Sequence, residues 1–232
     1  MKTMKTRYGI DFGTTNSVAS YIEGKGADAQ ALNFLYDDLP HPSVVWYKGT
    51  EIIVGKEAKE HADDLKYGGN EDDIIASPKI RLGKDINFFE IPGRKIPASE
   101  VSGEIFKHLK EHINTTLRER ELNEKTPDRA VVAVPVAMDG RARKELRYAA
   151  RCANIEIHQF IHEPLAALYA YLRKPRGDIN HNIHKRLAEY EDQYCLVCDW
   201  GGGTLDVTLV QIKNGMLFLD ILNIDISFLR HL

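Results

Sequence analysis

Near its start the chain reads Ile10-Asp11-Phe12-Gly13-Thr14-Thr15-Asn16-Ser17, and near its end it reads Cys198-Asp199-Trp200-Gly201-Gly202-Gly203-Thr204-Leu205-Asp206. In both segments a strand-like run reaches an aspartate and turns on glycine. A second strand-like run follows, at residues 18–22 and 207–210, where β-branched and apolar residues show no helical period. The sequence therefore predicts two similar β-hairpins, which indicates two clamps on one ligand.

The residue types at these turns suit a phosphate ligand. Glycine lets successive backbone N–H groups approach an anion, and three hydroxyls add donors, those of Thr14, Thr15 and Thr204. A carboxylate beside a polyphosphate is repelled unless a cation lies between them. The carboxylates of Asp11, Asp199 and Asp206 therefore indicate a divalent ion, for which hydrated Mg²⁺ is the best fit. We expect the ligand to be a nucleotide with its metal.

Each segment alone also fits an ordinary tight turn, because Gly and Asp favour turns for local reasons. Other nucleotide motifs fit less well. Neither segment contains the Gly-x-x-x-x-Gly-Lys-Ser/Thr of a Walker loop, and a strand rather than a helix follows each one, unlike a Rossmann fingerprint. The occurrence of both segments in one chain favours a phosphate site.

With three further segments, the hairpins resemble the Hsp70-type chaperones, within the wider superfamily of actin, sugar kinases and Hsp70 ATPases. These segments occur in the family's order: Pro42-Ser43-Val44-Val45 with residues 53–59, then Ser77-Pro78-Lys79-Ile80-Arg81-Leu82-Gly83, then Val132-Ala133-Val134-Pro135 followed by Glu163-Pro164-Leu165-Ala166-Ala167. The resemblance covers nearly the whole chain and is closer to Hsp70 than to actin or the kinases.

The resemblance implies a fold and a domain organisation. The fold would be α/β, of the ribonuclease H-like actin/Hsp70 ATPase type, with mixed sheets flanked by helices and a truncated second lobe. Residues 1–191 would form the first lobe of a nucleotide-binding domain, with a small subdomain at about 39–96, and residues 192–232 would begin the second lobe.

The resemblance also implies roles for single residues. Asp11 and Asp199 would hold the hydrated Mg²⁺, and Asp206 would orient that site. Lys79 would lie beside the γ-phosphate, and Glu163 would position water near the metal, which completes the catalytic set. The phosphates of ATP or ADP would contact Gly13, Thr14, Thr15, Asn16, Gly201, Gly202, Gly203 and Thr204.

Pro135 and Arg143 match, eight positions apart, the pair that relays the nucleotide state in this family. Ordinary structural roles stay open for these single residues. Lys79 and Arg81 also fit solvated charges of a loop, Glu163 before Pro164 fits a helix N-terminus, and Pro135 fits a strand terminator.

The composition is that of a globular protein. The chain has 232 residues, 43% of them hydrophobic, and can bury a substantial core as one large domain or two small ones. A formal net charge of -3 predicts no general affinity for nucleic acid or membrane. We recognise neither a signal peptide nor a transmembrane helix and therefore expect a cytoplasmic protein.

Cys195 and Cys198 have the C-x-x-C spacing of a redox or zinc half-site. Residues 194–199 read as a strand, however, and positions three apart on a strand point to opposite faces. We therefore favour buried packing thiols over a metal site.

Residues 174–191 depart from the Hsp70 pattern. Two histidines in this segment, His181 and His184, are spaced so that one helix face could present both to zinc together with the following cysteines. Because the strand separates the two thiols, we expect a mobile surface insertion instead. Trp200, inside the second hairpin, is bulkier than the residue usual in the family.

The remaining elements follow from periodicity and turn signals. We expect strands at 8–11, 18–23 and 31–36, a hairpin of 43–47 and 51–54 that turns at Gly49, a helix at 56–64 and an exposed loop at 66–73. A helix from Ser99 or Ser102, either one an N-cap, would bury a stripe of apolar residues: Ile105, Phe106, Leu109, Ile113 and Leu117.

Residues 130–136 form a continuous apolar run, which predicts a strand of the kind buried in a sheet, and Asp139 then begins another helix. That helix carries a basic stripe of Arg143, Arg147 and Arg151. The stripe fits nucleic acid or an acidic partner, but few aromatic residues interleave with it, and we expect a solvated face.

Hsp70-like ATPases continue beyond the segment that resembles residues 221–227 into a glycine pair, a second small lobe, an adenosine-binding segment and a peptide-binding domain. This sequence stops at Leu232, so we expect a fragment or the product of a truncated reading frame. Two functions follow: an ATPase whose nucleotide state gates a client or partner protein, or an inactive binding or scaffold module that keeps the fold. A sugar kinase is a third, for which we find no sugar-binding motif.

Overall fold

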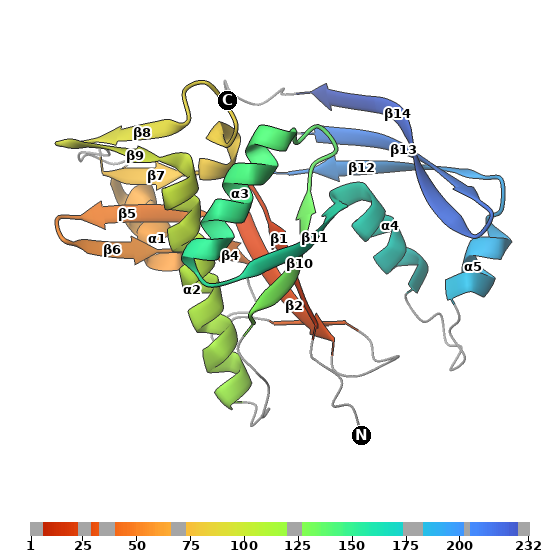
Figure 1. The fold of residues 1–232 in the computed structure, drawn as a ribbon, viewed down its shortest axis with the longest axis horizontal. Coiled ribbons are helices and arrows are strands. Elements are labelled where there is room, and N and C mark those ends of the chain that lie inside the picture. Colours follow the sequence, from red (N-terminus) through yellow and green to blue (C-terminus); the bar gives the residue numbers. More distant parts are fainter. Residues whose placement is uncertain are drawn as a thin grey trace. The chain divides into compact units, whose positions relative to one another are not determined.

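The computed structural model describes residues 7–22, 29–32, 40–65, 73–119, 127–173, 183–201 and 205–226, the last range without the side chains of 220–226. These residues form a mixed α/β structure (Figure 1). The chain divides into two compact units, Met1–Val132 with Met138–Phe160, and Ala133–Ala137 with Ile161–Leu232. Among the described residues, no helix combines the length and the apolar character needed to cross a bilayer.

The largest sheet contains six strands: β1 (Arg7–Phe12), β2 (Asn16–Ile22), β3 (Gln30–Ala31), β4 (His41–Pro42), β10 (Arg129–Val134) and β11 (Glu156–His162). Its order is β11-β10-β1-β2-β3, and β4 also pairs with β2. The first predicted hairpin is confirmed, because β1 and β2 pair antiparallel with Phe12 opposite Ser17. Of the predicted third strand at 31–36, residues 33–36 lie outside the described part of the chain.

Two helices of the first unit pack against each other, α2 (Ala98–Glu119) and α3 (Gly140–Cys152). The predicted apolar stripe of α2 is confirmed, since all five of its side chains are buried. The Phe106 ring stacks on the Phe12 ring of β1 with centroids 4.9 Å apart, which joins the helix to the sheet. Burial of each large apolar side chain contributes about 1.5–3 kcal/mol.

The predicted start of α2 is wrong. The helix begins at Ala98, directly after Pro97, and the Ala98 amide donates to the Asn87 carbonyl at 2.7 Å. Ser99 and Ser102 therefore lie within the first turns, and Ser102 is fully buried. The Ala98 N–H is thus satisfied by the Asn87 carbonyl, which lies outside the helix, and not by a serine side chain.

Smaller elements complete the first unit: β5 (Val44–Lys48), β6 (Glu51–Val54), α1 (Lys56–Leu65), β7 (Ile74–Ala76), the 3-10 helix η1 (Pro78–Arg81), β8 (Phe88–Ile91) and β9 (Arg94–Pro97). β5 and β6 form the predicted hairpin, and Gly49 at its turn has φ +62°. The helix predicted at 56–64 is confirmed by α1. Residues 66–72 of the predicted loop lie outside the described residues.

β10 ends at Val134, before Pro135, so the proline does terminate a strand. The predicted strand at 130–136 is confirmed as far as Val134. Ala130, Val132 and Val134 are buried, whereas the residues between them are half-buried, because only one face of the strand is fully covered. The predicted start of α3 is confirmed, since the Asp139 carboxylate accepts a hydrogen bond from the Ala142 amide at 2.8 Å.

The second unit contains an antiparallel sheet, β12 (Tyr194–Trp200), β13 (Leu205–Lys213) and β14 (Met216–Ile226), with α4 (Glu163–Arg173) and α5 (Ile183–Glu189). Its core joins both helices to β13 through Leu168, Leu172, Leu187, Val210 and Ile212. α5 lies within the segment predicted to be a mobile insertion. For residues 183–189 that prediction is wrong, because buried Leu187 attaches this helix to the core.

The two thiols of β12 lie on opposite faces, as predicted: Cys195 packs against this core and Cys198 is exposed. The prediction of buried thiols is therefore wrong for Cys198. Within the described ranges, no three or more His, Cys, Asp or Glu side chains gather so that they could hold a metal ion. His181 lies outside those ranges.

Candidate functional site

The first loop joins β1 to β2 in a conformation that only glycine permits at its start. A Cβ on Gly13 would lie 2.0 Å from the Asn16 carbonyl oxygen. The alternation of β1 buries Ile10 and Phe12 and leaves Asp11 exposed on the other face. Thr14 and Thr15 are half-buried and Asn16 is exposed. The loop is thus held by the core below it, while Asp11 remains accessible beside it.

Ser43 connects this loop to the segment that carries Lys79. Its amide donates to the Thr15 carbonyl at 2.8 Å, and its hydroxyl donates to the Gly13 carbonyl at 3.0 Å. The Ser77 amide in turn donates to the Ser43 carbonyl at 3.0 Å. Sequence reasoning did not identify Ser43 as a site residue. The residues next to Ser43 in the sequence do not indicate this role, because its hydrogen-bond partners lie 26 or more positions away in the chain.

Lys79 lies in η1 and is 8% exposed, so the alternative of a solvated loop charge is wrong for this residue. It is wrong for Arg81 as well. The Arg81 guanidinium donates to the Phe88 carbonyl and lies 4.1 Å from the Phe89 ring centroid. A buried lysine ammonium needs oxygen partners, which makes Lys79 suited to a defined position beside an anion.

Three histidines form a cluster next to the first loop: His41 of β4 with His108 and His112 of α2. His41 pairs with Ser17 in the sheet, and its ring centroid lies 4.6 Å from that of His108. Burial, followed by the neighbouring rings, lowers the pKa of His41 to about 3 and that of His108 to about 4. Burial also lowers the pKa of His112, against the opposing effect of Glu111. The cluster is therefore neutral at pH 7.

The second hairpin brings two carboxylates into register. β12 and β13 pair antiparallel, with Asp199 directly opposite Asp206 and Trp200 opposite Leu205. Directly opposite residues share one face of the sheet, with Cβ atoms about 4.5–5.5 Å apart. Asp199 and Gly201 are exposed, and the Trp200 side chain is 77% exposed. Gly202, Gly203 and Thr204 lie outside the described residues.

Glu163 is the first residue of α4 and follows β11 without a loop. The interpretation of Glu163-Pro164 as a helix N-terminus is thus confirmed, and a carboxylate is favoured there by the helix dipole. Its side chain is half-buried. The position is compatible with a carboxylate that also acts in chemistry.

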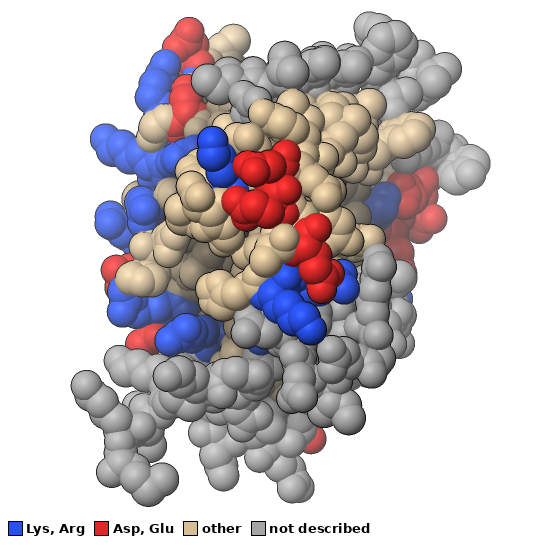
Figure 2. Space-filling view, turned by 90° about the vertical axis from the view of Figure 1, so that its right-hand side faces the viewer, with Lys and Arg blue, Asp and Glu red and all other residues tan. Residues whose placement is uncertain are grey.

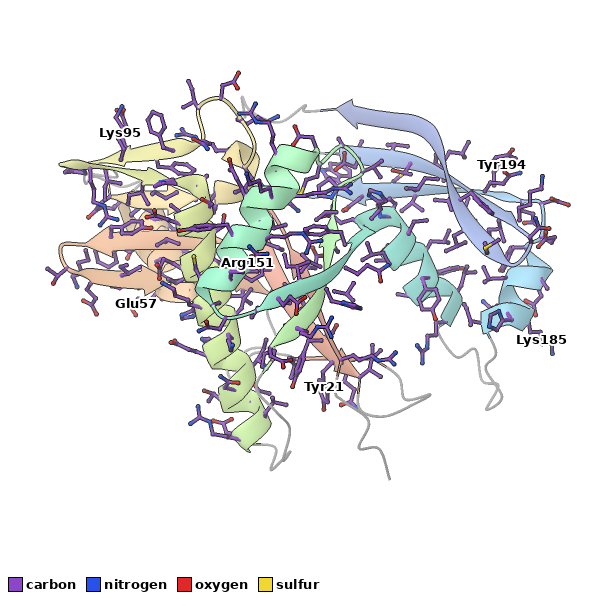
Figure 3. All side chains as sticks on the ribbon, in the orientation of Figure 1. Tyr21, Glu57, Lys95, Arg151, Lys185 and Tyr194 are labelled. Atoms are coloured by element: carbon purple, nitrogen blue, oxygen red, sulfur yellow. The ribbon has the colours of Figure 1, made fainter. Side chains whose placement is uncertain are left out.

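Arg143 and Arg147 are not a solvated face, so that prediction is wrong. The Arg143 Nε donates to the Met138 carbonyl at 2.9 Å, and the Arg147 guanidinium donates to the Ile157 carbonyl. Both guanidinium groups face the Phe160 ring, at 5.9 and 4.6 Å from its centroid. Arg151 alone is exposed (Figure 3). The stripe thus serves mainly to attach α3 to β11.

The predicted site residues are divided between the two units. The first unit holds Asp11, the loop of residues 13–16, Lys79 and Arg143. The second holds Pro135, Glu163, Asp199, Gly201 and Asp206. The face in Figure 2 carries both acidic and basic side chains, some of them side by side, with uncharged surface around them.

Comparison with known proteins identifies the family. A model described as Hsp70 protein matches residues 75–228. The chain is 33% identical over 207 residues to the chaperone protein DnaK of Mycoplasmopsis pulmonis, and 31% identical over 208 residues to that of Mycoplasmopsis agalactiae. Both matches cover 89% of this chain and 30% of the relative, so the chain spans less than a third of the relatives' length. The chain belongs to the Hsp70 family.

Proposed function

We propose that this chain is nucleotide-binding sequence of an Hsp70 chaperone, and that its two hairpins hold the polyphosphate of Mg²⁺-ATP or Mg²⁺-ADP. Family membership supports this function over that of a sugar kinase. The ribonuclease H-like actin/Hsp70 fold, the division into lobes at residues 191 and 192, and a cytoplasmic location are further parts of the proposal.

The observation that carries the proposal is the register of Asp199 opposite Asp206. Like charges at directly opposite positions destabilise an antiparallel pair, and a cation held at Asp199 would reduce this repulsion. The pair lies at the end of β12 and the start of β13, on either side of the glycines at 201–203 of the sequence, as Asp11 lies near Gly13 at the end of β1. The two ends of the chain thus repeat one construction.

The residues present fit a hydrated Mg²⁺, which keeps several waters and needs only one or two carboxylates besides phosphate oxygens. Asp11 and Asp199 would hold it, with Asp206 orienting the pair. Bound Mg²⁺ would neutralise charge on the phosphates. Backbone N–H groups at Gly13 and Gly201–203, with the hydroxyls of the three threonines, would bind the phosphate oxygens.

Lys79 and Glu163 would carry the hydrolytic step. The Lys79 ammonium would donate to the γ-phosphate and offset the charge that develops on it during transfer. The Glu163 carboxylate would accept a hydrogen bond from the attacking water and orient it. Both roles use groups whose positions are fixed by an element of secondary structure, η1 and α4 respectively.

Nucleotide state would gate a client or partner protein through Pro135 and Arg143. The Arg143 contacts with Met138 and Phe160 give that side chain a defined position from which a shift could be transmitted. Arg143→Ala should weaken the dependence of client binding on ATP in the parent chaperone, with an unchanged circular dichroism spectrum. An unfolded variant, or unaltered coupling, would assign Arg143 a structural role only.

Titration calorimetry with ATP in Mg²⁺ and in EDTA tests the proposal. We expect micromolar or tighter binding that depends on Mg²⁺, and at least tenfold weaker Mg²⁺-dependent affinity for Asp199→Asn. Asp192→Asn is the matched control, because Asp192 is an exposed aspartate of the same unit at φ +60°, a conformation that asparagine tolerates. Absence of binding would contradict the proposal and support an inactive scaffold module.

A further inference from the structure

The carboxylate of Glu145 on α3 binds the chain just beyond the Lys79 segment. The Gly83 amide donates to Glu145 Oε2 at 3.0 Å, and the Asn87 side-chain amide donates to Glu145 Oε1 at 2.9 Å. Both oxygens are therefore used, each by a donor more than 50 positions away in the sequence. Hydrogen bonds to an ionised acceptor are shorter and stronger than those between neutral groups.

The backbone of this loop lies directly against the first turn of α3. Gly83 has φ +73°, and a Cβ there would lie 2.5 Å from the Ala142 amide nitrogen. The Ala142 amide is itself bound by the N-cap carboxylate of Asp139. The loop and the helix start thus fit without space for a side chain, and Glu145, one turn farther along α3, extends the attachment.

Only a short, hydrogen-bonded segment separates Gly83 from Lys79. The Leu82 amide donates to the Lys79 carbonyl and the Lys84 amide donates to the Arg81 carbonyl, both at 3.2 Å. The Leu82 side chain is 3% exposed. Displacement of Gly83 from α3 would therefore move the η1 turn that carries Lys79.

We propose that Glu145 is a positioning residue for Lys79, which holds the 83–87 loop against α3 and thereby fixes the buried position of the Lys79 ammonium. The catalytic consequence rests on the role proposed above for Lys79, whereas the positional one does not. Ser43 holds the segment before Lys79 and Glu145 holds the segment after it. Because α3 also carries Arg143, a shift of this helix would reach Lys79 through Glu145.

The positional part can be measured without nucleotide, by the rate at which a lysine-reactive succinimidyl ester labels Lys79 in the whole chain, read by peptide mass spectrometry. We expect Lys79 to be labelled at least tenfold faster in Glu145→Ala than in the unaltered chain. Glu145→Gln should be intermediate, because its amide oxygen can accept one of the two hydrogen bonds. Unchanged labelling in both variants would overturn the proposal.

Asp85→Ala is the matched control. Asp85 pairs with Arg141 at 3.1 Å, which links the same loop to the same helix, but the two side chains are 95% and 65% exposed. An exposed pair contributes little, so this variant should label like the unaltered chain. Lys110, which donates to the Ala153 and Asn154 carbonyls at 2.9 Å, reports general loosening. If Lys79 and Lys110 are labelled faster by the same factor in both Glu145→Ala and Glu145→Gln, Glu145 has no specific effect on Lys79 and the proposal is overturned.

Turnover then separates this inference from the function on which it rests. In a chain that hydrolyses ATP, Glu145→Ala should lower kcat with the ATP Kd within twofold, and should add no further loss to Lys79→Ala. Additive losses would show that Glu145 does not act through Lys79 and would overturn the inference alone. If Lys79→Ala leaves kcat unchanged, the catalytic role of Lys79 fails, and the labelling rates still decide the positional role of Glu145.

Discussion

Gly13 has no room for a side chain in the first loop. A Cβ there would meet a backbone oxygen at 2.0 Å, which cannot withdraw without a shift of the β1–β2 hairpin. We predict that Gly13→Ala lowers the free energy of unfolding by about 1–3 kcal/mol, by analogy with overpacked cores. It should also weaken Mg²⁺-ATP binding at least tenfold, as measured by denaturant unfolding and calorimetry.

Gly140 provides the control for this substitution. It lies at the start of α3, where an added methyl group would meet no described atom within 4 Å apart from its chain neighbours and its own helix backbone, so Gly140→Ala should leave nucleotide affinity unchanged. Its stability should stay the same or rise by up to about 1 kcal/mol, since alanine is the better helix former. A Gly13→Ala chain as stable and as tightly binding as the unaltered one would contradict the geometry of the loop.

Lys79 is expected to act in the transition state more than in binding. Lys79→Ala should lower single-turnover hydrolysis by two orders of magnitude or more, with a modest loss of ATP affinity, because its charge matters most as the phosphoryl group transfers. The control is Lys95→Ala, at an exposed lysine paired with Glu90 (Figure 3). This substitution should leave the hydrolysis rate and the ATP affinity unchanged. Equal losses in rate and affinity for Lys79→Ala would count against the role.

Among the elements, α3 gives an unusual internal comparison, because Arg147 and Arg151 lie one turn apart in different surroundings. Arg147 donates to the Ile157 carbonyl and packs on the Phe160 ring, whereas Arg151 is exposed. We predict that Arg147→Ala lowers the free energy of unfolding by about 1–3 kcal/mol. Arg151→Ala should change it by less than about 0.5 kcal/mol. Equal effects in denaturant titrations would contradict the attachment of α3 to β11.

The contact between β4 and α2 should make stability depend on pH. His41 and His108 have folded pKa values of about 3 and about 4, below the ordinary histidine value of 6.5. Below pH 6.5 the unfolded chain therefore binds protons that the folded chain does not. Stability is complete above that pH and is lost as pH falls toward about 4, by up to about 1.4 kcal/mol per pH unit for each histidine.

Unfolding titrations between about pH 7.5 and about pH 4.5 test this dependence. His108→Leu should reduce the slope of unfolding free energy against pH, because one buried ring no longer titrates. An identical slope in the unaltered chain and His108→Leu would show that the cluster does not govern acid stability.

At the scale of the whole molecule, the hairpins and the amphipathic helix α2 could be predicted because their signals are local. Glycine and aspartate mark a turn by themselves, and an apolar stripe reports the buried face of its own helix. What could not be predicted depends on partners distant in the sequence. Ser43, Glu145 and the start of α2 are each defined by a hydrogen bond across more than ten positions.

The predictions for the arginines of α3 and for helix α5 were wrong for the same reason. A basic stripe looks solvated until Phe160 and the Ile157 carbonyl are placed beside it, and residues 183–189 look like an insertion until Leu187 meets the core of the second unit. Composition gave no indication of either contact. Family resemblance identified the proposed site residues, and physical contacts identified what supports them.

Paramagnetic Mn²⁺ in place of Mg²⁺ tests whether both hairpins hold one metal-bound polyphosphate. In a nitrogen-15 NMR spectrum of the chain with ATP, substoichiometric Mn²⁺ should broaden the Gly13 and Gly201 amide signals together, and EDTA should restore both. The turn amides of Gly93 and Gly215, in other hairpins, should keep their widths. Broadening at one loop without the other would contradict a shared metal and leave the two hairpins as independent turns.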